Sequence, residues 1–89
     1  MVERKAEIKN NAGIHVRPTG LIVQAARNFS CSITILAKGM DSDARDHFGI
    51  LAIGLQKGDI VEITTEGEKE EQAAETMVEL FETEFDFPK

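Results

Sequence analysis

The sequence has little that could cross-link the chain or anchor it in a membrane. It contains one cysteine, Cys31, so an internal disulfide is impossible, and its Cys and His residues lack the spacing of a structural zinc site. No window approaches the roughly 20 apolar residues that span a bilayer, and the N-terminal stretch MVERKAEIK has no apolar signal-peptide region. The fold must therefore depend on packing, and we expect a cytoplasmic protein without membrane insertion, metal or cofactor.

The chain is also too short for an elaborate architecture. Its 89 residues leave room for one hydrophobic core and one modest surface site. Apolar residues make up 42% and charged residues 29%, a composition typical of globular proteins and unlike that of disordered chains. A two-domain enzyme with a deep cleft is excluded, and residues 1–89 are expected to form a single domain.

Charge is distributed unevenly along the chain. The net charge is −6, but residues 1–40 hold six Lys or Arg against two Glu, whereas residues 41–89 hold four bases against fourteen acids. The acidic half would repel a phosphate backbone, which argues against nucleic-acid binding. A small anion or an acidic protein partner would suit the basic half.

Alternating apolar residues predict strands, and longer periodic segments predict helices. Strands are expected at residues 2–8, 32–37, 40–44 and 59–66. Helices are expected from Val16 to about Arg27, at residues 47–53 behind an Asp46 N-cap and ending near Gly54, and from Glu68 to about Glu84. The apolar residues of the first helix are Leu21, Ile22, Val23, Ala25 and Ala26.

The element order βαββαβα predicts a two-layer α+β fold. Three helices, each with one apolar stripe, can cover one face of a four-stranded sheet and leave the other face in water. The turn Lys38-Gly39 should pair the second and third strands antiparallel. Cys31, beside a strand, is expected to be a packing residue, and Phe85 and Phe87 either pack back on the sheet or fray.

The most informative stretch is Gly-Ile-His-Val-Arg-Pro-Thr at residues 13–19, where His15 falls at the start of the first helix. Pro18 suits a first helical turn, because the N–H that it lacks would have no partner there. The backbone amides of Val16 and Arg17 then stand free at the positive end of the helix dipole. A neutral imidazole offers a lone pair to a phosphoryl group, whose oxygens the amides and Arg17 could bind.

This stretch resembles the active-site motif of HPr, the histidine phosphocarrier of the bacterial phosphoenolpyruvate-dependent sugar phosphotransferase system. Length, element order and Gly49 in the second helix also match. The resemblance implies sheet order 1-4-2-3, and phosphorylation of His15 at Nδ1 by enzyme I, with Arg17 binding the phosphate. The phosphoryl group would pass to an enzyme IIA component, so the protein would be a carrier and not an enzyme, and we expect a monomer.

The resemblance also implies a docking surface for these partners. That surface combines the start of the first helix with the second helix, and Phe48 and Leu51 would be its apolar anchors, with Arg17 and Arg27 facing acidic partners. Its expected residues are Gly20, Gln24, Arg27, His47, Phe48 and Leu51.

Two positions depart from the family pattern. Asp46 stands where many relatives carry a regulatory serine, so it either simply caps the helix or partly imitates a phosphorylated serine. His47 replaces an apolar residue and is either a solvated residue or a second functional histidine. Together with Asp41 and Asp43 these residues suggest a metal site, but the loop lacks the glycine and distal glutamate of an EF-hand, so no metal is expected.

Other functions are compatible with the same residues. His15 could be an ordinary capping histidine, although its neighbours argue against that. The chain could also serve a regulatory or nitrogen-related phosphorelay, or act as a binding module through the Asp46–Leu51 surface with vestigial transfer. Relatives that act only as binding modules generally lack the histidine, so its presence favours the carrier.

Overall fold

A computed structural model describes residues 1–11, 13–14 and 16–84 of the chain. It confirms the predicted order of strands and helices. The elements are β1 (Val2–Glu7), α1 (Val16–Ala26), β2 (Ser32–Ala37), β3 (Met40–Asp43), α2 (His47–Ile53), β4 (Ile60–Glu66) and α3 (Glu70–Phe81). His15, Phe85 and Phe87 lie outside the described residues, so the two alternatives for the phenylalanines stay open.

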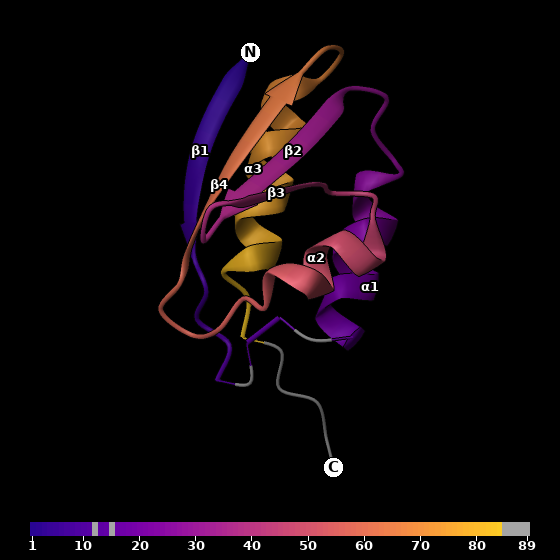
Figure 1. Cartoon of the computed structure of the whole chain (residues 1–89). Coiled ribbons are helices and arrows are strands. Elements are labelled where there is room, and N and C mark those ends of the chain that lie inside the picture. Colours follow the sequence, from indigo (N-terminus) through magenta and orange to yellow (C-terminus); the bar gives the residue numbers. More distant parts are fainter. Residues whose placement is uncertain (12, 15, 85–89) are drawn as a thin grey trace.

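The four strands form one antiparallel sheet in the order β1-β4-β2-β3, as the resemblance implied. Ala6 pairs with Val61 across β1 and β4, and Ile35 pairs with Ile63 across β2 and β4. All three helices lie on one side of this sheet, and α1 and α2 lie next to each other at one end of the helical layer (Figure 1). The predicted two-layer α+β fold is confirmed.

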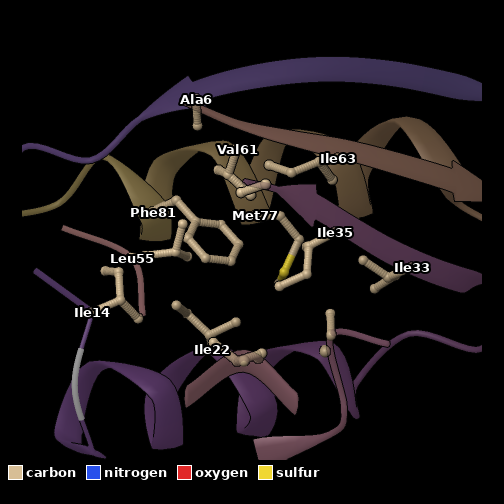
Figure 2. Packing of buried hydrophobic residues seen from close by; sticks show 14 of the residues in the cluster. Ala6, Ile14, Ile22, Ile33, Ile35, Leu55, Val61, Ile63, Met77 and Phe81 are labelled. Carbon is tan, nitrogen blue, oxygen red and sulfur yellow. The ribbon is translucent and has the colours of Figure 1, made fainter. Parts of the chain in front are cut away.

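The core fills the space between the sheet and the helices. Alternate residues of β2 and β4 point inward, among them Ile35 and Ile63, and meet Met77 and Phe81 of α3 and Ile22 of α1 (Figure 2). These side chains have no more than 1% of their surface exposed, so every layer of the fold contributes to one core. Cys31 is buried in the same cluster, which agrees with its predicted packing role.

The predicted boundaries of several elements are wrong by one to three residues. The last helix begins at Glu70 and not at Glu68, because Lys69 has a positive φ angle of 58°, which a helix cannot include. It ends at Phe81, before the predicted end near Glu84. Ile8 and Ala44 follow β1 and β3 instead of belonging to them, although both are buried. Asp59 precedes β4 and belongs to a turn.

The helices in the described part of the chain include none that is long and apolar enough to cross a membrane.

Candidate functional site

Helix α1 begins at Val16, the residue after His15 in the sequence, as predicted. Pro18 lies in its first turn and is fully buried, so the proline both starts the helix and anchors it to the core. The first amides of any α-helix point along the helix axis toward its N-terminal end, and here that end carries Val16 and Arg17. The first turn holds no acidic residue, so nothing on the helix itself opposes an anion at this end.

The loop that leads to His15 is closed on itself. Asn10 is buried, its Nδ2 donates to the carbonyl oxygen of Gly13 at 2.7 Å, and the Gly13 amide donates back to the Asn10 carbonyl oxygen at 2.9 Å. Gly13 has a φ of 73°, and a Cβ there would collide with the carbonyl oxygen of Leu55. The Ile14 amide donates to that same oxygen at 2.9 Å. The glycine of the motif is therefore required for the loop to lie against Leu55.

Helix α2 is capped at both ends. The carboxylate of Asp46 accepts a hydrogen bond from the Gly49 amide at 3.0 Å, which confirms the predicted N-cap. Gly54 adopts a left-handed conformation and ends the helix, also as predicted. A Cβ at Gly49 would collide with Oγ of Ser42 and Oδ2 of Asp46, so a larger residue would require both side chains to move.

The structure brings the expected docking residues of α1 and α2 together. A Cβ at Gly20 would lie 3.9 Å from Cε1 of His47, so the histidine ring packs on the face of α1. Phe48 is 82% exposed. Leu51 is half-buried, so it offers a partner less apolar surface than expected of an anchor. Gln24 and Arg27 are exposed on the last turn of α1 and just after it.

Two apolar residues of α1 that the sequence did not assign to this surface are also exposed. Leu21 was expected to contribute to the apolar stripe, but it is 43% exposed, and Val16 is 64% exposed. Leu21 lies four residues after Arg17 and three before Gln24, so it shares their side of the helix. This spacing was the signal in the sequence that could have shown that Leu21 faces solvent.

His47 is not simply solvated, as one interpretation of the sequence held. It is half-buried, packs against α1, and its ring makes an edge-to-face contact with Phe48 at a centroid distance of 6.0 Å. Because it lies in α2 and packs on α1, His47 joins the two helices of the docking surface.

Within residues 1–11, 13–14 and 16–84, no group of three or more His, Cys, Asp or Glu side chains is arranged to hold a metal ion.

Arg45 holds the start of α2 in place, a role that the sequence did not reveal. Its Nη2 donates to the carbonyl oxygens of Phe29 and Cys31 at 2.6 and 2.7 Å, and its Nη1 lies 3.5 Å from Oδ1 of Asp43. The guanidinium thereby connects the segment between α1 and β2 to the residue that precedes the Asp46 cap.

Comparison with known proteins gives consistent matches over nearly the whole chain. The family described as "PTS HPr component phosphorylation site" matches residues 2–83. The phosphocarrier protein HPr of Vibrio cholerae serotype O1 is 35% identical over 80 residues, which cover 90% of this chain and 94% of that one. The HPr-like protein Crh of Halalkalibacterium halodurans is 32% identical over 84 residues, covering 94% and 100% of the two chains.

Solved structures match the fold equally well. The phosphocarrier protein HPr from Bacillus anthracis superposes with a TM-score of 0.87 at 30% identity, over 91% of this chain and 96% of that one. HPr-C-His from Thermoanaerobacter tengcongensis superposes with a TM-score of 0.85 at 37% identity, over 91% of each chain.

Proposed function

Because the chain belongs to the HPr family of phosphotransferase-system phosphocarriers, we propose that His15 carries the phosphoryl group and that Arg17 binds it. The protein is accordingly a phosphoryl carrier that interacts with other proteins of the phosphotransferase system, and not an enzyme in its own right. In the proposed transfer, the bond from phosphorus to the donor breaks as a bond to Nδ1 of His15 forms. In the second transfer, the bond from phosphorus to Nδ1 breaks as a bond from phosphorus to the acceptor forms.

The observation that carries this proposal is the start of α1 directly after His15. The first turn contains the amides of Val16 and Arg17 and the Arg17 side chain, and it contains no acid. Phosphate on the preceding residue would bear about −1.5 to −2 charges beside the positive end of the helix dipole. Hydrogen bonds from a charged group such as Arg17 are worth about 1.5 to 3 kcal/mol each.

We further propose that the donor is enzyme I and that the acceptor is an enzyme IIA component. The face formed by α1 and α2 supports this, because it combines the exposed Phe48 with Arg17 and Arg27. An apolar anchor with a basic rim fits an acidic partner. The proposed working unit is a monomer of one domain in the cytoplasm.

The direct test is phosphorylation by enzyme I and phosphoenolpyruvate, followed by intact-mass spectrometry. Wild type should gain one phosphoryl group, and His15→Ala should gain none. His47→Ala is the matched control, because it removes the other histidine of the chain, and it should still gain one group. An unchanged mass of the wild type, or a phosphorylated His15→Ala variant, would contradict the proposal.

The role of Arg17 is tested separately. Arg17→Ala should unfold at the wild-type temperature, because the residue is exposed, but it should transfer the phosphoryl group more slowly. Loss of one charged hydrogen bond of about 2 kcal/mol corresponds to a rate about 30-fold lower if the bond forms in the transition state. Full activity in this variant would show that the backbone amides suffice.

A second candidate function is a regulatory binding module that acts through the surface from Asp46 to Leu51. The observation in its favour is the 82% exposure of Phe48 beside the Asp46 cap. Affinity for a partner protein that ignores His15→Ala but collapses in Asp46→Ser would favour this module. Loss of the protein's function in His15→Ala would favour the carrier.

A further inference from the structure

The loop before His15 depends for its position on the turn that follows α2. The carbonyl oxygen of Leu55 accepts the hydrogen bond of the Ile14 amide at 2.9 Å, and Ile14 is the residue immediately before His15. Ile14 and Leu55 are both buried, and their side chains point into the core toward Phe81 (Figure 2). Any shift of Leu55 would therefore shift Ile14 with it.

This turn, residues 54–59, is held together by an ion pair. Nζ of Lys38 donates to the carbonyl oxygen of Gly54 at 2.6 Å and lies 2.9 Å from Oδ2 of Asp59. The same carboxylate oxygen accepts the Gln56 amide at 2.7 Å. Lys38 and Asp59 thus clamp the residues on both sides of Leu55, and they tie them to the turn between β2 and β3.

The other end of the turn is fixed to β1. The Gly58 amide donates to the carbonyl oxygen of Ile8 at 2.8 Å, and the Ile8 amide donates to the carbonyl oxygen of Asp59 at 2.9 Å. Backbone bonds also reach the ends of the stretch from Gly54 to Gln56, because the Gly54 amide donates to the carbonyl oxygen of Leu51 at 3.1 Å and the Gln56 carbonyl oxygen accepts the Asp59 amide at 2.9 Å. The Lys38–Asp59 pair adds side-chain contacts to both ends of this stretch. Leu55 lies in that stretch.

We propose that Lys38 and Asp59 are positioning residues for phosphoryl transfer, because their ion pair fixes the turn on which the His15 loop rests. Neither residue is part of the motif at residues 13–19 or of the expected docking surface. The pair acts through Leu55 and Ile14. This inference rests on the proposed function, since it assigns a role in the same transfer.

The geometry of transfer gives such a pair a measurable effect. In-line displacement at phosphorus requires the attacking nitrogen to be aligned with the bond that breaks, and a misplacement of about 1 Å can cost about 100-fold in rate. Loosening the turn should therefore lower the rate of transfer within the complex. Docking through α1 and α2 should persist, because the lost contact reaches Gly54, the residue that ends α2, and none of the expected docking residues.

The test measures transfer from phosphorylated enzyme I to Lys38→Met and Asp59→Asn, at a temperature where circular dichroism shows each variant folded. We expect kcat to fall at least about fivefold, with KM within about twofold of wild type. Lys38→Arg, which restores the charge, should recover most of the rate. Lys5→Met is the matched control, because it breaks a surface pair with Glu62 on the sheet, 3.9 Å apart, and should transfer normally.

Hydrogen exchange of the Ile14 amide gives a second readout that a general loss of stability would not move selectively. It should speed up in Lys38→Met and Asp59→Asn relative to the core amides, and stay unchanged in Lys5→Met. Wild-type kcat in both variants would overturn the inference, as would a slower transfer with Ile14 exchange unchanged. If wild type itself is not phosphorylated, the proposed function fails instead, so the two failures are distinguishable.

Discussion

At the scale of single residues, Thr19 of α1 and Thr65 of β4 form a natural pair for testing buried hydroxyls. Both are fully buried, but Thr65 Oγ1 donates to the carbonyl oxygen of Glu70 at 2.7 Å, whereas Thr19 Oγ1 has no hydrogen-bond partner among residues 1–11, 13–14 and 16–84. A buried hydroxyl without a partner retains its desolvation cost and gains nothing in return. Replacing each threonine with valine should therefore change the free energy of unfolding in opposite directions.

Thr19→Val is expected to raise the free energy of unfolding by about 1 kcal/mol, because it removes an unpaired polar group. Thr65→Val is expected to lower it by about 1 to 2 kcal/mol, because it leaves the Glu70 carbonyl oxygen without its donor. Urea denaturation of both variants measures the difference. A Thr19→Val variant as unstable as Thr65→Val would contradict this explanation.

Asp46 also acts at this scale, and its two interpretations predict different results. If it only caps α2, Asp46→Ser should leave both stability and phosphorylation by enzyme I nearly unchanged, since serine caps equally well, while Asp46→Ala should cost about 1 kcal/mol. If it imitates a phosphorylated serine, Asp46→Ser should be phosphorylated faster. Urea denaturation and initial rates separate the two, and the observed cap favours the first.

At the scale of elements, the turn at residues 54–59 should make stability depend on acid. The hydrogen bond from Lys38 and the Gln56 amide hold the pKa of the Asp59 carboxyl below its usual value. A depressed folded-state pKa stabilises the protein above the unfolded pKa of about 4, and this contribution is lost as pH falls through the folded value.

Lys38→Met removes the main cause of the lowered Asp59 pKa, so the stability of this variant should depend less on acid. The free energy of unfolding of wild type should decrease more steeply than that of Lys38→Met as pH falls below about 4. Above that pH the two curves should run parallel. Denaturant titrations at successive pH values make the comparison, and parallel curves throughout the acid range would contradict the assignment to Asp59.

Local sequence patterns predict some features of the elements and miss others. Alternation in β2 and β4 and the Asp46 cap are local signals, and the sequence predicted them. The start of α3 was missed because Lys69 adopts a left-handed φ that its residue type does not announce. The contacts of Arg45 with Phe29 and Cys31, and of Lys38 with Asp59, join residues distant in sequence, so only the folded structure reveals them.

At the scale of the whole molecule, charge is separated between the helices. The segment from Val16 to Arg27 contains two arginines and no acid, whereas α3 contains four glutamates and no base. The folded protein therefore presents a basic face at α1, while its net charge is −6. This asymmetry should orient the protein as it approaches an acidic partner.

Association with enzyme I should accordingly slow as ionic strength rises, because salt screens steering between surface charges. We expect the association rate constant to fall by about tenfold between low salt and roughly 0.5 M salt, and Arg27→Gln should weaken that dependence. Glu75→Gln on α3 is the control and should not weaken it. Stopped-flow measurements test this, and a rate independent of salt would show that steering plays no part.

The proposed bond from phosphorus to Nδ1 of His15 can be observed by heteronuclear NMR of the protein labelled with ¹⁵N at histidine. After incubation with enzyme I and phosphoenolpyruvate, the Nδ1 resonance of His15 should show coupling to ³¹P, while the resonances of His47 stay unsplit. Coupling at Nε2 of His15, coupling at His47, or no coupling at all would contradict the account.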